Sequence, residues 1–452
     1  DVLLSAGWLE SLVRTMDSYC SCGAVGAKLV HLDGRLQEAG SIIWRDGSAC
    51  GYGRGGDPEQ PEYCYVREVD YCSAACLMVR RDLFQALGGF DERYAPAYYE
   101  DTDLCMAVWE AGYKVVYQPE ATVYHAEFGS GDTAKAIELQ LGNRAKFVDK
   151  WQKRLAERPA AGDNHLLVAR DRRTGRRILV VDDRIPVAAL GQGMPRARAL
   201  LDALVDLGYV VTFLPVQPTS DQAAAGELGQ RGVEVLCGLA DAEAKLAERT
   251  NMYDVAIVSR PHNAPWMRIV KQYNPRAAVI YDAEAIFALR EIRQAGVQGN
   301  PIPAEVAKTL VESEVALVDG ADAVITVSEP ERRIIQSYRP RMPVSVWGHV
   351  ASVRPSEAQL ESRSDLLFVG YLGSAPNEDA TTHLLKDILP RIRAQLDCRL
   401  YVVGADPSQD IRELASSFSD AVVLAGFVEY LTPFYERCRV FVAPHRFSAG
   451  LP

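Results

Sequence analysis

The chain has 452 residues, of which 48% are hydrophobic and 24% charged, a balance that is typical of globular proteins and excludes a disordered chain. Its formal net charge of −11 argues against a nucleic-acid partner, because binding to phosphates favours a positive face. No apolar run reaches the roughly eighteen residues that a membrane-spanning helix needs. The sequence therefore predicts about three domains in a cytoplasmic protein, with peripheral contact to the inner face of the membrane as an alternative.

The first residue and the cysteines lead to two further expectations, about the extent of the chain and about its thiols. The first residue is Asp1 rather than Met and no signal peptide precedes the first domain, so we expect a fragment that is cut at both ends. Among the ten cysteines, only Cys20/Cys22 and Cys72/Cys76 lie close together, and neither pair has the spacing of a zinc site. Free thiols in a reducing compartment are the expected state.

The first block, residues 1–130, mixes short strands with one clear helix. Residues 23–30 and 68–79 are rich in β-branched and small apolar residues, which predicts strands. Apolar residues recur at helical spacing over 101–111. Residues 114–117 and 121–124 read as a short strand pair around a proline.

A helical and basic linker is predicted over 131–176. Its first part can form a helix that buries Phe147, Trp151 and Leu155. The run from 170 to 177, with the sequence RDRRTGRR, is basic in an acidic protein. It predicts a solvated linker, and contact with anionic lipid headgroups is the alternative.

From residue 177 onward, apolar strands alternate with helices, which is the pattern of doubly wound parallel sheets. We expect one such domain at 177–350 and a second, incomplete one at 351–452. The fold class is therefore α/β, with a partial mixed-sheet domain followed by two Rossmann-like domains. The predicted strands lie at 178–182, 209–214, 255–258, 278–281, 323–327, 366–370, 400–403 and 440–443.

An acidic cluster opens the helix predicted over 101–111. Glu100, Asp101 and Asp103 fall at its N-terminus, where the helix macrodipole alone favours acidic residues by about 0.3–1 kcal/mol each. A GGFDE turn at 88–92 precedes the cluster, and His125 lies just before a Gly-Ser pair after the next strands.

This series of motifs resembles the acceptor half of family 2 glycosyltransferases with the GT-A fold. The resemblance covers 1–130. It rests on the GGFDE turn, the Glu-Asp pair and the histidine, together with Gly7-Trp8-Leu9, Asp33-Gly34, Gln37-Glu38-Ala39-Gly40 and Val69-Asp70.

The resemblance implies roles for these residues. Asp101 would be the base that takes the proton of the acceptor hydroxyl, Glu100 would shape the site and Asp70 would bind the acceptor. A divalent cation, Mn²⁺ or Mg²⁺, would offset the charge of the leaving diphosphate, with Asp1 and His125 as its ligands; a structural role is the alternative for His125. The family's nucleotide-binding first strands would lie upstream of Asp1.

A glycine loop follows the strand at 178–182. It contains Gly191 and Gly193 and leads into a helix that carries Arg196. Glycines at such a turn let backbone N–H groups approach an anion, although a plain tight turn is the alternative. The loop lacks the spacing of a dinucleotide-binding or an ATPase motif.

Residues 177–452 resemble family 4 glycosyltransferases with the GT-B fold. The second half of this resemblance rests on the glycine loop at 368–379 and on the strand ends near Gly404, Gly426 and Pro444. It implies that Gly370, Gly373, Gly193 and Arg196 face the donor diphosphate without a metal cofactor. Arg290 is a weaker candidate, since a surface salt bridge would explain it equally well. The ribose-binding glutamate pair of the family would follow Pro444, beyond the printed residues.

The sequence therefore predicts a bifunctional glycosyltransferase that uses nucleotide-sugar donors and extends a surface glycan or a lipid-linked saccharide. Fusing two transferases would raise the effective concentration of the first product at the second site. One alternative keeps only one module active. Another is a carbohydrate-binding scaffold without catalysis, because a fold does not imply an activity.

Overall fold

The computed structural model describes residues 2–126, 133–162, 166–187, 193–217, 221–236, 242–350, 355–356, 358–448 and 450. The chain divides into two compact units. The first comprises Asp1–Val180, Leu204–Asp254 and Tyr273–Arg276, and the second comprises Val181–Ala203, Val255–Gln272 and Ala277–Pro452. Among the described residues, no helix is both long enough and apolar enough to cross a membrane.

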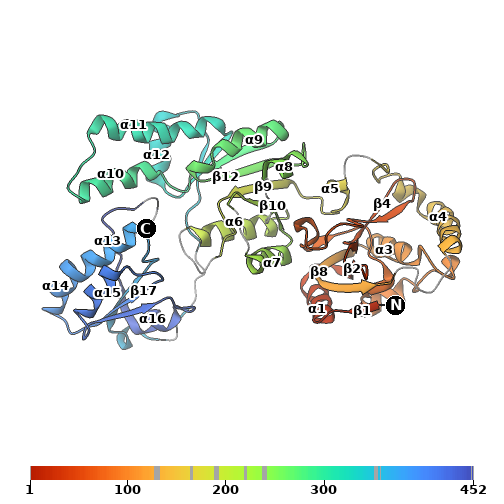
Figure 1. Cartoon of the computed structure of the whole chain (residues 1–452), viewed down its shortest axis with the longest axis horizontal. Coiled ribbons are helices and arrows are strands. Elements are labelled where there is room, and N and C mark those ends of the chain that lie inside the picture. The colour runs from red at the N-terminus through yellow and green to blue at the C-terminus, as the bar shows by residue number, and fades with distance from the viewer. Residues whose placement is uncertain are drawn as a thin grey trace. The chain divides into compact units, whose positions relative to one another are not determined.

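A mixed sheet forms the centre of the first unit (Figure 1). Its strand order is β1-β8-β2-β3, with β6 paired to β8 and β7 to β2. Only the β2–β8 pair is parallel. The strands are β1 (Val2–Leu4), β2 (Cys22–Val30), β3 (Leu36–Glu38), β6 (Arg67–Glu68), β7 (Leu77–Val79) and β8 (Lys114–His125), and a separate hairpin joins β4 (Ser41–Ile43) to β5 (Ala49–Gly51).

Two strand predictions in this block were wrong in detail. The strand pair expected at 114–117 and 121–124 is one continuous strand, β8. It accommodates Pro119 by a shift in its pairing register with β2, between Ala27 and Lys28. The strand expected over 68–79 is interrupted, because the Ser73 side chain accepts a hydrogen bond from the Ala75 N–H and starts a short 3₁₀ turn at Ala74–Cys76.

Helices cover this sheet. The helix predicted at 101–111 is confirmed as α3 (Glu100–Glu110). The helix predicted after residue 131 is α4 (Thr133–Leu155), and Phe147 and Leu155 are buried in one cluster with Ile43, Tyr94 and Met106, as the sequence predicted. The remaining helices of this block are α1 (Trp8–Ser18), α2 (Arg81–Ala86) and α5 (Leu166–Ala169).

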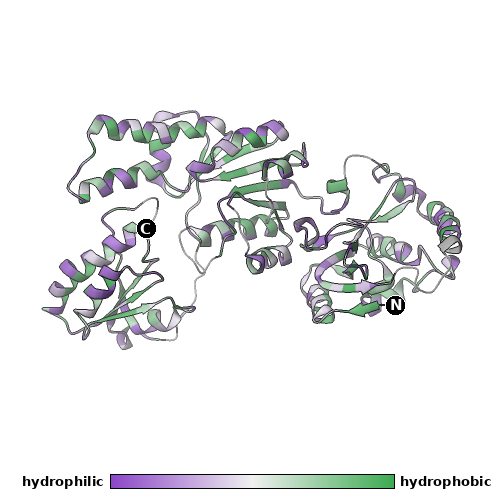
Figure 2. Cartoon of the chain, in the orientation of Figure 1, coloured by the Kyte–Doolittle hydropathy of each residue, from purple (hydrophilic) through white to green (hydrophobic). Residues whose placement is uncertain are grey.

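Two parallel sheets follow, as the alternating pattern predicted. The larger has the order β11-β10-β9-β12-β13-β14-β15 and the smaller the order β18-β17-β16-β19. Their strands are apolar and stand out in green among helices of mixed polarity (Figure 2). The strands are β9 (Arg177–Asp182), β10 (Val210–Pro215), β11 (Glu234–Val235), β12 (Val255–Ser259), β13 (Ala278–Asp282), β14 (Ala323–Thr326), β15 (Val344–Val346), β16 (Asp365–Val369), β17 (Leu400–Val403), β18 (Val422–Gly426) and β19 (Cys438–Phe441).

Helices accompany both parallel sheets, and those of the smaller sheet surround β17 in Figure 1. They are α6 (Met194–Asp206), α7 (Gln222–Gln230), α8 (Ala242–Ala247), α9 (Pro265–Tyr273), α10 (Phe287–Val297), α11 (Ala304–Val315), α12 (Glu329–Tyr338), α13 (Ala375–His383), α14 (Leu389–Arg393), α15 (Gln409–Ser416) and α16 (Thr432–Arg437).

The basic run at 170–177 is packed inside the first unit, so the prediction of a solvated linker was wrong at its start. The Arg170 side chain is fully buried and donates to Glu234 of β11 at 2.8 Å. Arg249 donates to the same carboxylate oxygen at 2.7 Å. Arg170 also stacks over the rings of Tyr52 and Tyr65. We call Arg170, Glu234 and Arg249 the arginine seam.

Backbone hydrogen bonds next to the arginine seam join the same parts of the first unit. The Val66 N–H donates to the Gly229 carbonyl at 2.9 Å, and the Arg172 N–H donates to the Glu68 carbonyl at 2.9 Å. A side chain at Gly229 would place its Cβ 2.5 Å from the Cys64 carbonyl oxygen, so the backbone segments at Cys64 and Gly229 approach each other as closely as glycine allows. The mixed-sheet block and the β10–β11 edge of the larger sheet are therefore one packed body.

Candidate active sites

The acidic cluster predicted from the sequence lies at the start of α3. Tyr98 and Tyr99 precede the helix in the left-handed region, with φ of 75° and 74°. Asp101 accepts hydrogen bonds from the Ala74 N–H at 3.1 Å and from the Thr102 N–H at 2.7 Å. Burial raises the pKa of Asp101, and these N–H groups lower it.

Glu38, which the sequence analysis named only as part of a family motif and without a site role, joins this cluster. Its carboxylate is buried and accepts from the Ser73 N–H at 3.0 Å. Because Ser73 and Ala74 are consecutive, two neighbouring backbone N–H groups hold Glu38 and Asp101 next to each other. The pKa of Glu38 is raised to about 7, because burial and the charge of Asp101 together outweigh the lowering effect of the Ser73 N–H.

Glu100 completes the cluster. Its Oε2 atom is buried and has no hydrogen-bond partner in the described part of the chain. Burial and the neighbouring Asp101 raise its pKa. Glu100 and Asp101 at the start of α3 and Glu38 on β3 thus bring together three carboxyl groups with raised pKa values, which is typical of sites that exchange protons.

Asp103 has a different place, although it belongs to the same sequence run. It accepts from the Tyr94 hydroxyl at 3.0 Å, from the Trp151 ring nitrogen at 2.7 Å and from Lys150 at 2.7 Å. These partners tie α3 to α4, so Asp103 is a structural acid.

The predicted cation site can be examined only in part. Asp1 lies outside the described residues. His125, at the end of β8, places Nδ1 3.1 Å from the amide nitrogen of Gln37. Within the described ranges, no group of three or more His, Cys, Asp and Glu residues could hold a metal ion. The described residues alone therefore do not form a cation site, and we derive no step through a cation.

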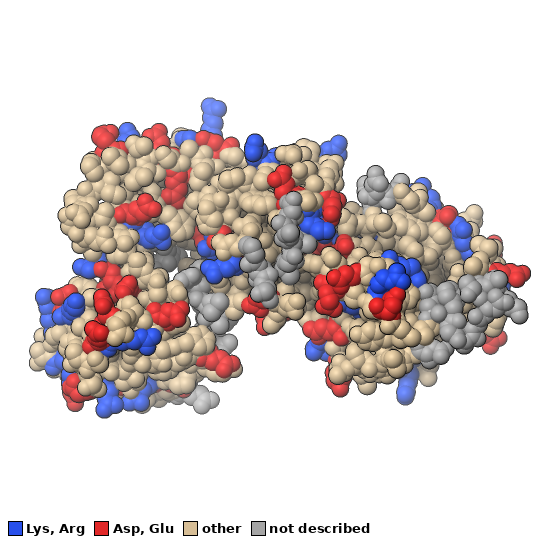
Figure 3. Space-filling view, in the orientation of Figure 1, with Lys and Arg blue, Asp and Glu red and all other residues tan. Residues whose placement is uncertain are grey.

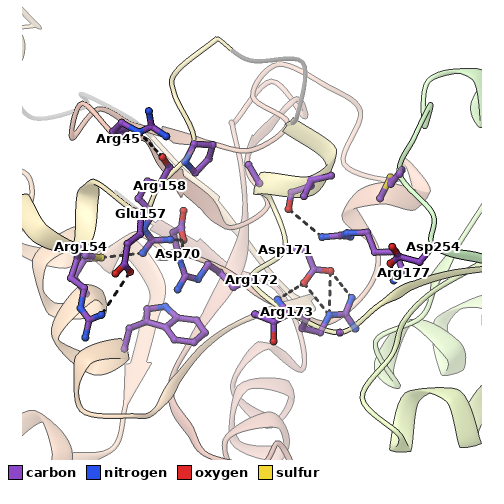
Figure 4. A pocket seen from close by; sticks show the side chains of 18 of the residues that line it. Arg45, Asp70, Arg154, Glu157, Arg158, Asp171, Arg172, Arg173, Arg177 and Asp254 are labelled. Carbon is purple, nitrogen blue, oxygen red and sulfur yellow. Dashed lines mark hydrogen bonds and ion pairs between the residues drawn. The ribbon is translucent and has the colours of Figure 1, made fainter. Parts of the chain in front are cut away.

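Asp70, the predicted acceptor-binding residue, lines a hollow of about 940 Å³ within the first unit (Figure 4). Its carboxylate accepts from the Ile43 N–H at 2.8 Å and pairs with Arg158 and, at 3.3 Å, with Arg172. Arg172 lies over the Trp109 ring. With both oxygens held internally, Asp70 serves as a structural anchor, and its role in acceptor binding gains no support here.

Charged side chains make up most of the wall of this hollow. Six arginines and five acidic residues line it, and most are paired with each other, as Asp171 is with Arg173 (Figure 4). The charges of its wall nearly cancel, so we assign no ligand to it.

The second unit carries charged groups at the carboxyl ends of its parallel strands, where ligands bind in sheets of this type. Arg196, predicted to contact a phosphate, is instead buried and forms a bidentate pair with Asp282 at 2.7 and 3.0 Å. Its Nε atom donates to the Trp347 carbonyl at 3.0 Å. These contacts occupy the guanidinium, so Arg196 acts mainly by positioning the strand end.

A pocket of about 670 Å³ lies in the second unit. Three of the residues predicted to face the donor diphosphate, Gly193, Arg196 and Gly370, line it together with Arg290, Asn377 and His445. Arg290 lies over the Phe287 ring at 5.1 Å and has no acidic partner in the described part of the chain.

Asn377 connects two sides of this pocket. Its amide donates to the Tyr371 carbonyl at 2.9 Å, and its oxygen lies 2.7 Å from the His445 ring nitrogen. A Cβ at Gly370 would lie 2.8 Å from that amide, which explains the glycine. Gly373 packs against the Tyr371 ring in the same way but does not line the pocket.

Comparison with known sequences identifies the last part of the chain. Residues 363–452 match the family model described as "Glycosyl transferases group 1". This segment is a group 1 glycosyltransferase domain. It contains β16, the glycine loop and the pocket residues Gly370, Asn377 and His445.

Curated relatives extend the similarity. An O-antigen biosynthesis protein RfbC of Myxococcus xanthus is 27% identical over 209 residues, which is 43% of this chain and 16% of that protein. An N-acetylglucosaminyl-diphospho-decaprenol L-rhamnosyltransferase of Mycobacterium tuberculosis is 39% identical over 82 residues, 18% of this chain and 26% of that protein. An uncharacterized protein y4gI of Sinorhizobium fredii is 35% identical over 133 residues, 28% of this chain and 14% of that protein.

The chain thus spans about a quarter or less of the length of these relatives. The prediction of a glycosyltransferase domain is confirmed for residues 363–452, and the relatives named for O-antigen biosynthesis and rhamnosyl transfer add similarity in sequence only. Among solved structures, an apo structure of OtsA matches with 10% identity over 62% of this chain and 80% of that chain, at a TM-score of 0.38. Such a low score carries no argument about this chain.

Proposed function

We propose that the protein transfers sugars from nucleotide-sugar donors to a growing surface glycan or lipid-linked saccharide, and that it does so at two separate sites. The observation that carries the proposal is the pocket of the second unit. A group 1 glycosyltransferase segment contributes a glycine loop and Asn377 to it, and Arg290 supplies a cation without an acidic partner in the described ranges. A glycine loop and a cation suit the diphosphate of the donor.

The first site is the acidic cluster at the start of α3. Inverting transfer needs a base that accepts the proton of the attacking hydroxyl. Asp101 is our candidate for this base, because its burial raises its pKa and thereby favours proton uptake. The resemblance to family 2 enzymes supports the same assignment.

We further propose that transfer at the first site depends on Mn²⁺ or Mg²⁺ and that transfer at the second does not. This part of the proposal rests on the resemblance alone. The expected place of action is the cytoplasm or the inner membrane face. On the face drawn in Figure 3, acidic and basic side chains are intermixed, so any membrane contact there is not driven by a broad basic patch.

The test is a screen for transfer and donor hydrolysis with UDP-, GDP- and dTDP-sugars, with Mn²⁺ and with EDTA. Turnover that EDTA abolishes assigns chemistry to the first site, and turnover that survives EDTA assigns it to the second. No turnover with any donor would refute the proposal in favour of a carbohydrate-binding scaffold.

A further inference from the structure

A buried glutamate lines the pocket of the second unit in a backbone conformation that glutamate rarely adopts. Glu284 follows β13 with φ of 51°, and its side chain is only 12% exposed. Its backbone N–H donates to Asp282 at 3.1 Å, which fixes the turn. Strained residues that the surrounding structure holds in place are typical of functional sites.

The partner of Glu284 is strained as well. Arg260 follows β12 with φ of 78°, and its Nη2 atom lies 3.3 Å from Glu284 Oε1. Its Nε atom donates to Asp182 at 2.7 Å. Asp182 therefore holds the stronger contact with this arginine, and no described group donates a hydrogen bond to the Glu284 carboxylate.

A glycine keeps space in front of this carboxylate. Gly193 has φ of 82°, and a Cβ at that position would lie 3.2 Å from Glu284 Oε1. Gly193 and Glu284 both line the pocket to which Gly370 and Arg290 contribute. Beyond its ion pair with Arg260, the carboxylate thus keeps acceptor positions that can receive a hydrogen bond from a ligand in the same pocket.

The charges around Glu284 favour proton uptake near neutral pH. Burial raises its pKa to about 7; Arg260 lowers it, Asp182 and Asp282 raise it, and Arg196 lowers it. These four groups come from the ends of β12, β9 and β13 and from α6. A base works best when its pKa lies near the working pH.

We propose that Glu284 accepts the proton of the acceptor hydroxyl during transfer at the second site, an inference that rests on the proposed function of that pocket. The hydroxyl O–H bond breaks and its proton passes to the carboxylate. The hydroxyl oxygen bonds to the anomeric carbon of the donor sugar, and the bond from that carbon to the diphosphate breaks. The nucleoside diphosphate leaves with the bonding electrons, and the proton later passes from Glu284 to water.

The test compares wild-type protein with Glu284→Gln, which keeps the shape of the side chain and removes its basicity. Glu305→Gln, an exposed glutamate on α11, is the matched control. EDTA-resistant transfer is measured from pH 5.5 to 8.5, and binding of UDP, GDP and dTDP is measured by calorimetry. For wild type, kcat/KM should rise with pH through about 7, because the base must be ionised.

Glu284→Gln should lower kcat by about 10²–10⁴-fold and lose the rise with pH, while the Kd of the bound nucleotide stays within twofold and Glu305→Gln behaves like wild type. The inference is overturned if Glu284→Gln keeps wild-type kcat and pH dependence, or if it loses nucleotide binding together with activity, which indicates a structural role. Absence of EDTA-resistant transfer in the wild type would instead refute the proposed function of the pocket.

Discussion

Replacing Glu234 with glutamine removes the one carboxylate that two buried arginines share. In the arginine seam, Arg170 and Arg249 both donate to the same oxygen of Glu234, and the three side chains are at most 3% exposed. Glutamine preserves the shape of the side chain but leaves the two guanidinium groups only their longer contacts, Arg170 with Glu62 at 3.4 Å and Arg249 with Glu248 at 3.8 Å.

The expected cost follows from this geometry. Removing one partner of a buried ion pair costs about 3–5 kcal/mol. Although burial alone would raise it, Arg170 and Arg249 hold the pKa of Glu234 well below its ordinary value. A carboxyl whose folded-state pKa is lowered contributes stability above its unfolded pKa and loses it as the pH falls through the folded value. The difference between wild type and Glu234→Gln should therefore be full at pH 7 and shrink below about pH 4.

Urea unfolding at pH 7, followed by tryptophan fluorescence and circular dichroism, measures this cost. Four of the six tryptophans, Trp8, Trp44, Trp109 and Trp151, lie in the first unit, and Trp266 and Trp347 lie in the second. The fluorescence signal is therefore weighted toward the first unit, and a second transition reports the second unit. Glu138→Gln, which removes the same charge from an exposed position on α4, should stay within about 0.5 kcal/mol of wild type. If Glu234→Gln loses no more than this control, the seam does not hold the two blocks together and the reasoning is refuted.

Three further predictions concern the two sites. Asp101→Asn should lower EDTA-sensitive transfer by about 10²–10⁴-fold with an unchanged urea midpoint; near-normal turnover would exclude Asp101 as the base. Glu38→Gln should be more stable relative to wild type at pH 8 than at pH 5, because a carboxyl whose pKa is raised to about 7 loses its stabilising contribution as the pH rises through that value. Urea unfolding at the two pH values should show that the difference in free energy of unfolding changes by about 3 kcal/mol, and equal differences at both would contradict the prediction. Arg290→Ala should raise the donor Kd by about tenfold or more without loss of stability, whereas Arg196→Ala should destabilise the fold; calorimetry and urea unfolding separate the two, and equal donor affinity after Arg290→Ala would remove it from the site.

The sequence predicted most elements whose signal is local. Apolar runs located eight of the eleven described strands of the parallel sheets to within about two residues, as at β9 (Arg177–Asp182) and β13 (Ala278–Asp282), but β11, β15 and β18 were not predicted. Helical spacing located α3 and the buried face of α4. These signals depend on neighbours along the chain, so no tertiary information was needed.

Partners that lie far apart in the chain could not be predicted. Arg196 looked like a phosphate contact beside a glycine loop, but Asp282, 86 positions later, holds it. Asp70 looked like an acceptor contact, but Arg158, 88 positions later, neutralises it. The basic run at 170–177 looked solvated because its acid, Glu234, lies in another part of the sequence.

No site role was predicted for Glu38 or Glu284, for a related reason. Neither belongs to a dense acidic cluster in the sequence, and only burial next to other carboxylates makes them unusual. The positive φ of Glu284 also has no sequence signal, because glutamate does not ordinarily adopt it. Arg290 was ranked as a weaker candidate because a surface salt bridge would explain it equally well, and among the described residues it lies over the Phe287 ring instead.

The most direct test of two separate transfer sites is product analysis by mass spectrometry with wild type, Asp101→Asn and Glu284→Gln, each supplied with the donors that the screen identifies. Our account predicts that wild type forms two kinds of sugar linkage and that each variant loses a different one. Loss of both linkages in either variant, or transfer that neither substitution affects, would contradict it.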